Sequence, residues 1–279
     1  MNQWTKKPTL PELPEVETIA RQLARSIQGR RIRRLQILDS RLAPRQAGRA
    51  RGRTVRRVLR LGKRIVMEMA GASGKPPLWL AVHLGMTGRL IWIQNQPSLK
   101  KKHLRARLVL EGGDLCFYDV RRWGKLGIYT SLDEVTPAGL DPVCGAFTRG
   151  KLSTLLAGSR QEIKVWLMRQ DRLTGIGNIY ASEILHSDRI HPVRLAGVLD
   201  ATEAGRLHSA TRRVLDNAIK KCGTTFSDFQ DTAGRIGSYQ KYLKVYGRAG
   251  KPCRRCRAPI ERIVQQGRST FFCPKCQRC

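Results

Sequence analysis

The stretch Pro11-Glu12-Leu13-Pro14-Glu15-Val16-Glu17 opens the first patterned element of this 279-residue chain. Its two prolines pre-set the entry to a helix, and its early carboxylates favour the positive end of the helix dipole. One face of the following segment is apolar and carries Val16, Ile19, Ala20 and Leu23. The pattern ends at Gly29 and predicts a helix over residues 15–26. On local physics alone, the stretch needs no role beyond that of a helix start.

From Arg30 onward the apolar period changes to two, which indicates strands. Gly, Pro and Asp clusters separate eight short runs, which are 31–37, 54–59, 64–69, 78–83, 89–93, 106–110, 115–118 and 127–129. One leading helix followed by about eight strands is typical of a β-sandwich or barrel.

The second half of the chain is helical in pattern. Candidate helices are 151–156, 161–167, 179–187 and 201–222. The last has Asp200 as N-cap, Glu203 three residues on and Gly223 after its end. Residues 224–237 are polar and are expected to form a mobile loop. We therefore expect an α+β chain with an extension at 1–10, an N-terminal β-sandwich at 11–140, a linker at 141–150, a helical domain at 151–250 and a metal-binding hairpin at 251–279.

Charge constrains the partner. The chain has 53 Lys+Arg against 21 Asp+Glu, a net charge of +32 and a pI near 11.0. Such self-repulsion favours a polyanion partner and argues against an ordinary small-metabolite enzyme. Between Arg30 and Arg64, fourteen basic residues face one acid, Asp39. No apolar run approaches the ~18–20 residues that span a bilayer, no basic amphipathic helix suits a membrane surface, and residues 1–10 lack the apolar core of a secretory signal. Nucleic acid is the expected partner.

The cysteines at the end of the chain predict a metal site. Sixteen residues separate Cys253-x-x-Cys256 from Cys273-x-x-Cys276. Four thiolates in two such pairs match one closed, structural, tetrahedral Zn²⁺ site, and this use of cysteine suits a reducing cytosol. Residues 260–272 between the pairs are expected to form a β-hairpin. A chance cluster in a Cys-rich tail is the alternative, and Cys279 is a competing ligand.

Five motifs in order resemble those of bacterial formamidopyrimidine-DNA glycosylase. They are the opening stretch, His83-Leu84-Gly85-Met86-Thr87-Gly88, Asp119-Val120-Arg121-Arg122-Trp123-Gly124, Gly175-Ile176-Gly177-Asn178-Ile179-Tyr180-Ala181-Ser182-Glu183 and the four-cysteine end. The resemblance implies a monomeric base-excision repair enzyme of the bacterial cytosol. Such an enzyme excises 8-oxoguanine and formamidopyrimidines from duplex DNA and has AP lyase activity. It also implies a helix–two-turn–helix domain in the second half. The related endonuclease VIII branch, which removes oxidised pyrimidines, has a different opening and is the alternative.

The resemblance implies the catalytic residues. Pro11 matches the N-terminal nucleophile, whose secondary amine attacks C1′ and forms a Schiff base that leads to β,δ-elimination. Glu12 matches the general acid that protonates the sugar ring oxygen. Glu15 matches a helix-start carboxylate that organises the site, and Lys63 a lysine that contacts the phosphates and the lesion.

The resemblance also implies DNA contacts. Met86, Arg121 and Trp123 match three residues that fill the gap left by the flipped nucleotide, because a base must leave the stack before C1′ can be reached. The family usually has Phe at the position of Trp123. Trp still stacks, so the role is expected to survive; a core position in the sheet is the alternative. His83 is interpreted as a sheet residue rather than a ligand.

Three further residues, Lys164, Asn178 and Arg268, match phosphate contacts. Asn178 follows a Gly-x-Gly turn and opens a helix, where backbone N–H groups favour an anion. Arg169 stands where the family commonly has an acid, which puts local helix capping in question. Residues 224–239 match a lesion-covering loop, in which Gly234 and Gly237 permit closure.

One departure affects the chemistry. Pro11 is internal as the sequence is written, so its nitrogen is a tertiary amide whose lone pair is delocalised and cannot attack. We expect translation to start at position 10, because the codon TTG encodes Leu internally but can initiate with Met, and that Met is then removed. Proteolytic trimming of residues 1–10 is a second hypothesis. A third is that the extension stays and the chain is a non-catalytic DNA-binding protein.

Overall fold

The structure is a computed structural model and describes residues 10–42, 44, 46–71, 75–94, 100–224, 232 and 237–278. The described residues divide into two compact units. One comprises the described parts of 6–136 and 222–238, and the other comprises 137–221 and 239–278. Each unit has a hydrophobic core of its own. The expected α+β class is confirmed, whereas the division into five segments stays a prediction.

The first unit begins with α1 (Leu13–Ile27), which packs against strands β2 and β3. The predicted apolar face is buried, with Val16, Ile19 and Leu23 fully inaccessible to solvent. The helix starts two residues earlier than the sequence pattern predicts. The reason is that the Glu15 carboxylate accepts a hydrogen bond from the Glu12 backbone N–H at 2.9 Å and closes the first turn.

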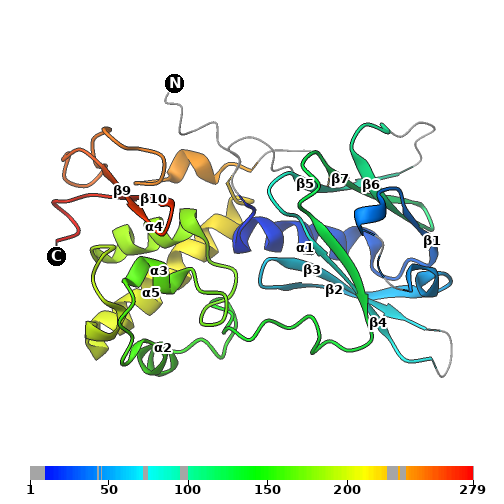
Figure 1. The fold of residues 1–279 in the computed structure, drawn as a ribbon, viewed down its shortest axis with the longest axis horizontal. Coiled ribbons are helices and arrows are strands. Elements are labelled where there is room, and N and C mark those ends of the chain that lie inside the picture. The colour runs from blue at the N-terminus through cyan, green and yellow to red at the C-terminus, as the bar shows by residue number, and fades with distance from the viewer. Residues whose placement is uncertain are drawn as a thin grey trace. The chain divides into compact units, whose positions relative to one another are not determined.

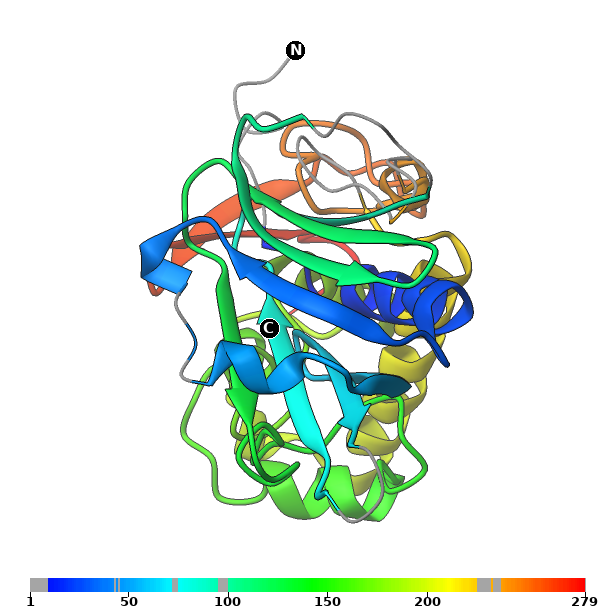
Figure 2. The ribbon, with the colours of Figure 1, turned by 90° about the vertical axis from the view of Figure 1, so that its right-hand side faces the viewer.

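Two four-stranded antiparallel sheets complete this unit, as the β-sandwich prediction required (Figure 1). The first sheet has the order β1 (Ile32–Ile37), β6 (Leu104–Leu110), β7 (Gly113–Asp119), β5 (Gly88–Ile93). The second has the order β2 (Thr54–Leu61), β3 (Arg64–Ala70), β4 (Leu78–His83), β8 (Lys125–Tyr129). Figure 2 shows them as separate layers. Short 3₁₀ turns η2 (Ser40–Leu42) and η3 (Ala47–Ala50) follow β1. Side chains of α1 and of both sheets form one core.

All eight predicted strands are present, and differences arise at their ends. Strand β6 starts at Leu104 rather than at 106 because a β-bulge between Leu104 and Ala106 keeps the earlier residue paired with Tyr118. Strands β3 and β4 are buried along nearly their whole length, since a second cluster around Val66, Trp79 and Val135 covers their other face.

The second unit contains α2 (Arg149–Leu156), α3 (Ile163–Leu167), α4 (Asn178–Asp188), η4 (Ala196–Val198) and α5 (Ala201–Lys220). Helix α3 starts at Ile163 rather than 161, because Gln161 and Glu162 pair with the backbone around Leu195 instead. The predicted capping box of α5 is present: Asp200 Oδ1 accepts from the Glu203 N–H at 2.7 Å, and Glu203 Oε2 accepts from the Asp200 N–H. Helix α5 ends before 222, since Cys222 and Gly223 are left-handed.

The chain closes with η5 (Tyr239–Tyr242) and the hairpin of β9 (Glu261–Gln265) and β10 (Arg268–Phe272). Gln266 and Gly267 both have positive φ, the geometry of a two-residue hairpin turn that matches strand twist. The hairpin predicted over 260–272 is confirmed. Most of the expected loop at 224–239 lies outside the described residues, as do Gly234 and Cys279. No helix among the described residues is long and apolar enough to cross a bilayer.

Candidate nucleic-acid interface and zinc centre

The start of α1 is a buried, hydrogen-bonded corner of the first unit. Pro11 is buried, and Glu12 and Glu15 are 3% and 2% exposed. Besides the Glu12 N–H, Glu15 accepts the Thr224 backbone N–H at 2.6 Å. A side chain on Gly223 would meet Glu15 at 2.6 Å, so this approach requires glycine. Glu15 therefore ties the predicted nucleophile and acid to the segment that follows α5.

Lys63 lies with Gly62 in the tight turn between β2 and β3 and is half-buried. The hairpin is fastened to α1 by an ion pair between Arg60 and Glu17, with Nε and Oε2 at 2.7 Å. Burial raises the pKa of the Glu17 carboxyl, but Arg60 and Arg21 outweigh it and hold the pKa below its usual range. The pair therefore fixes the hairpin that carries Lys63 relative to the helix that carries Pro11.

Met86 lies in the turn between β4 and β5, and Arg121 and Trp123 lie in the loop after β7. The structure brings this turn and this loop together. A side chain on Gly85, which has φ +62°, would lie 2.7 Å from the Trp123 backbone. Arg121 stacks over the Trp123 ring at 5.4 Å, and Trp123 is 55% exposed. A core position for Trp123 is therefore wrong; the ring is presented to solvent, where it can enter a duplex.

Asp119 organises the loop. Its carboxylate accepts hydrogen bonds from the Thr87 hydroxyl, the Gly124 N–H at 2.7 Å and the Arg121 N–H at 3.2 Å. Asp119 is 1% exposed. Because Thr87 follows Met86 directly, one buried carboxylate connects the positions of Met86, Arg121 and Trp123. Sequence reasoning assigned Asp119 no role, although it stands in a quoted motif.

A basic cavity of about 570 Å³ adjoins Trp123 and is lined in part by Arg64, His83 and Lys125. Burial, followed by the charges of Arg64, Lys63 and Lys125, lowers the pKa of His83. His83 Nδ1 accepts a hydrogen bond from the Gly85 N–H at 3.1 Å. His83 is the last residue of β4, which agrees with its interpretation as a sheet residue, and the basic side chains beside it in the cavity are lysine and arginine.

In the second unit, Asn178 opens α4 beside strand β10. Its Nδ2 donates to the Ser269 carbonyl at 2.9 Å, while its Oδ1 is buried with no hydrogen-bond partner among the described residues. Arg268, the neighbour of Ser269, is exposed at the hairpin turn. The structure thus brings Asn178 and Arg268 to one region, where the helix start and a guanidinium suit a phosphate.

Lys164 is fully buried, and its Nζ donates to the Thr270 hydroxyl at 2.7 Å. This position ties α3 to the hairpin; contact with a phosphate stays a prediction. Arg169, which occupies a position that is usually acidic, binds Asp171 through Nε at 2.9 Å and Gln161 through a second nitrogen at 3.2 Å. The turn after α3 is therefore held by an Arg–Asp pair.

The four predicted cysteines form a compact cluster. The Sγ atoms of Cys253, Cys256, Cys273 and Cys276 all lie within 4.8 Å of one another. The Cys256–Cys273 and Cys253–Cys276 separations are 3.4 and 4.0 Å. Sulfurs about 2.3 Å from a tetrahedral zinc stand about 3.8 Å apart, so the cluster fits the ion without rearrangement.

Two buried side chains of α4 contact the C-terminal segment that leads to the cysteine cluster. Glu183 accepts backbone N–H groups of Lys244, Val245 and Tyr246 at 2.9–3.1 Å. His186 Nε2 lies 3.6 Å from Cys253 Sγ. Sequence reasoning missed both, because their partners lie about sixty residues away and no local spacing indicates them.

Comparison with known proteins assigns most of the chain to known families. The family models for the "Formamidopyrimidine-DNA glycosylase N-terminal domain", the "Formamidopyrimidine-DNA glycosylase H2TH domain" and the "Zinc finger found in FPG and IleRS" match residues 10–126, 138–230 and 250–278. The sandwich, the helical unit and the zinc hairpin thus define a DNA-repair glycosylase of the helix–two-turn–helix class.

Individual relatives agree. A formamidopyrimidine-DNA glycosylase of Desulforamulus reducens is 39% identical over 96% of this chain and 99% of its own. The solved MutM (Fpg) protein of Thermus thermophilus is 38% identical, covers 96% of this chain and 98% of its own, and has a TM-score of 0.84. The solved Lactococcus lactis Fpg in complex with abasic-site DNA is 30% identical, covers 96% of this chain and 100% of its own, and has a TM-score of 0.85. This chain belongs to the formamidopyrimidine-DNA glycosylase family, which makes it a base-excision DNA glycosylase with one structural zinc ion.

Proposed function

We propose that this chain removes 8-oxoguanine and formamidopyrimidines from duplex DNA and then cleaves the strand through a Schiff base on the Pro11 nitrogen. The observation that carries the proposal is the buried start of α1. There Glu15 holds the backbone of Glu12 and of Thr224, and the Glu17–Arg60 pair fixes the Lys63 hairpin to the same helix. The proposed nucleophile and acid stand at this buried helix start, and the ion pair links the hairpin that carries the proposed cation to the same helix.

The chemistry follows from these groups. The Pro11 nitrogen attacks C1′ of the damaged nucleotide, and the bond from C1′ to the base breaks. Glu12 protonates the sugar ring oxygen as the bond from C1′ to that oxygen opens, which leaves a 4′-hydroxyl and an iminium between the Pro11 nitrogen and C1′. The resulting iminium acidifies the 2′ hydrogens. Loss of a 2′ proton expels the 3′ phosphate, and a second elimination expels the 5′ phosphate. Proline suits this role because its secondary amine gives a cationic imine that has no N–H proton to lose.

Access to the damaged base requires the Met86 turn and the Arg121–Trp123 loop. An apolar side chain, a guanidinium and an indole that enter the duplex offset the stacking and pairing lost on flipping. Asn178 and Arg268 hold phosphates, and a zinc ion keeps the hairpin that bears Arg268 folded. Lys164 binds the same hairpin through its hydrogen bond to the Thr270 hydroxyl.

The proposal requires that residues 1–10 be removed, since only a free amine can form the imine. The Desulforamulus relative aligns along 99% of its own length but 96% of this chain, which is consistent with residues beyond the family's common length. Start of translation at position 10 followed by loss of Met is the simplest route. The relatives named here are bacterial, and we place the enzyme in the bacterial cytosol, at the nucleoid, as a monomer.

A second candidate substrate class has its own support. Wild-type Lactococcus lactis Fpg, 31% identical to this chain, has been solved with DNA that contains an oxidised pyrimidine. The same relative, as a variant, has also been solved with Fapy-dG DNA. Excision of oxidised pyrimidines is therefore the alternative activity of the same site, with the same nucleophile.

The test compares three proteins: the chain from Met1, the chain from Pro11, and the Pro11-start chain with Glu12→Gln. Each protein is incubated with a mixture of duplexes that carry 8-oxoguanine, formamidopyrimidine or an oxidised pyrimidine, so that the three lesions compete for the enzyme. We expect the Pro11-start chain alone to cleave, to prefer the purine lesions, and to leave phosphate on both ends of the gap. Equal cleavage by the chain from Met1, or preference for the pyrimidine, would contradict the proposal.

A further inference from the structure

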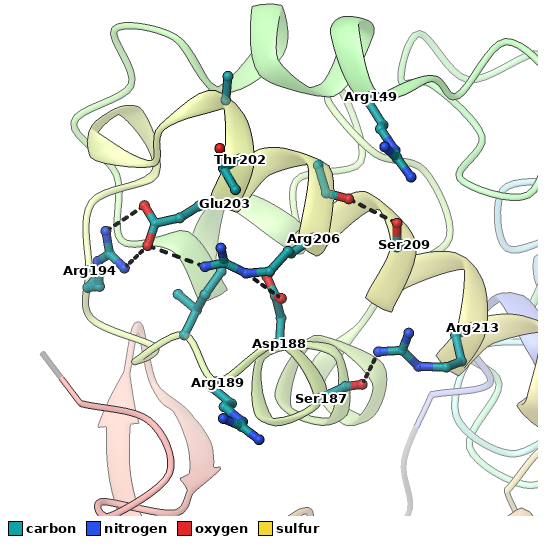
Figure 3. A pocket seen from close by; sticks show the side chains of 13 residues that line it. Arg149, Ser187, Asp188, Arg189, Arg194, Thr202, Glu203, Arg206, Ser209 and Arg213 are labelled. Atoms are coloured by element: carbon teal, nitrogen blue, oxygen red, sulfur yellow. Dashed lines mark hydrogen bonds and ion pairs between the residues drawn. The ribbon is translucent and has the colours of Figure 1, made fainter.

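The second unit contains a cavity of about 770 Å³ that none of the assigned roles uses (Figure 3). It is formed by the C-terminal end of α4, the segment after it, the first half of α5 and Arg149 at the start of α2. Asn178 is the first residue of α4, whereas the cavity lies at the C-terminal end of that helix. The 11-residue helix spans about 16 Å, so the cavity is separate from the predicted phosphate contact of Asn178.

Five arginines and two carboxylates line the cavity, and they are Arg149, Arg189, Arg194, Arg206, Arg213, Asp188 and Glu203. Both acids are already engaged. Glu203 binds Arg194 through two bonds of 2.6 and 2.9 Å, and Arg206 lies 3.7 Å from Asp188. Positive charge therefore exceeds negative charge in the cavity.

Three of the arginines are available to a ligand. Arg149, Arg189 and Arg213 are exposed and make no ion pair with any residue in the described part of the chain. Arg213 donates to the Ser187 hydroxyl at 2.9 Å, which leaves most of its donors open. Figure 3 shows these three side chains coming from three different elements around the cavity. Guanidinium groups donate charge-assisted hydrogen bonds to the oxygens of phosphate esters.

We propose that this cavity is a second phosphate-binding site, which takes the backbone of a DNA segment other than the one in the catalytic site. A site lined by exposed arginines from three elements suits an extended polyanion. The chain's net charge of +32 favours binding of a polyanion. The second site lets the enzyme hold one segment while it searches another. The inference rests on DNA binding by the family, not on the Schiff-base chemistry.

The negative charge of Asp188 weakens phosphate binding in the cavity. Its Oδ2 is buried without a hydrogen-bond partner among the described residues, and burial raises its pKa to about 6, against the opposing effect of Arg206. The charged groups around it are Arg149, Arg189, Arg194, Glu203, Arg206 and Arg213. Protonation of the carboxyl removes its repulsion of a phosphate, so we expect the second segment to bind more tightly as the pH falls from 7 to 5.

The experiment first fills the catalytic site of the Pro11-start enzyme with a short duplex that carries an uncleavable abasic analogue. A labelled undamaged duplex is then titrated, and anisotropy reports the second binding event. The test variant is Arg149→Gln/Arg189→Gln/Arg213→Gln. The matched control is Lys100→Gln/Lys101→Gln/Lys102→Gln, which loses the same charge from an exposed segment of the other unit.

We expect the wild type and the control to bind the second duplex. The triple-arginine variant should bind it at least about tenfold more weakly, with the slope of log K against log salt reduced by about 2–3 for three lost phosphate contacts. Cleavage of the lesion duplex should stay unchanged. Asp188→Asn should tighten the second binding at pH 7 and remove its change between pH 5 and 7.

Three results would overturn the inference: no second binding by the wild type, equal losses in the variant and the control, or binding of inorganic phosphate or a mononucleotide that depends on the three arginines while no second duplex binds. The last would assign the cavity to a small phosphate instead of DNA. Failure of the first duplex to bind would count against the proposed function itself, which keeps the two tests distinct.

Discussion

Asp119 shows what a single buried side chain contributes to this molecule. Its carboxylate accepts three hydrogen bonds and so holds the Met86 turn against the loop of Arg121 and Trp123. Family resemblance could predict Met86, Arg121 and Trp123, because the family motifs assign each of them a role. It could not predict the carboxylate behind them, because its hydroxyl partner, Thr87, is 32 residues away and the contact exists only in the folded sheet.

Replacement of Asp119 by Asn exchanges an acceptor oxygen for a donor that faces N–H groups. We expect the free energy of unfolding to fall by about 1–3 kcal/mol. Excision of a damaged base should slow markedly, whereas cleavage at a pre-formed abasic site, where no base has to be removed, should change less. Urea unfolding and single-turnover assays measure the two effects.

The control for this prediction is Asp133→Asn, an exposed aspartate of the same unit. It should match the wild type in both measurements. If Asp119→Asn behaved like Asp133→Asn, the buried network would have no part in positioning the loop.

At the scale of elements, hydrophobic periodicity predicted every strand of the first unit and the four main helices of the second. The ends differ where a long-range contact competes with local pattern. Residues 161 and 162 fit a helix but pair with the backbone near Leu195, and the bulge in β6 lengthens that strand. Likewise Lys164 matched a phosphate contact, and only the packing of α3 against the hairpin shows that it is buried.

The hairpin of β9 and β10 has a small core of its own, in which two zinc-site cysteines are buried. Structural zinc sites supply about 10–16 kcal/mol of binding free energy, which small modules need to fold. Removal of zinc with a strong chelator should therefore abolish amide protection in β9 and β10 and weaken DNA binding, while β2 and β3 stay protected. Hydrogen exchange and a colorimetric zinc assay follow these changes.

One zinc ion per chain is expected. Cys256→Ser should lose it, and Cys144→Ser, a cysteine outside the cluster, should keep it. Protection of the hairpin that survives complete zinc removal would contradict a structural role for the metal.

At the scale of the whole molecule, the chain forms two compact units and carries a large net positive charge. Composition alone predicted a polyanion partner, and family membership now identifies it as DNA. Composition could not predict where the charge lies. Some of the basic residues are engaged in ion pairs such as Arg60–Glu17 and Arg194–Glu203, whereas Arg149, Arg189 and Arg213 of the α4–α5 cavity make no ion pair among the described residues.

The central claim is that the Pro11 nitrogen becomes the N-terminus and the nucleophile. The most direct measurement incubates natively expressed protein with 8-oxoguanine duplex and borohydride, then maps the adduct by mass spectrometry. We expect a reduced cross-link on the nitrogen of an N-terminal Pro11. Intact residues 1–10 with DNA binding but no adduct, or an adduct on Lys63, would contradict it.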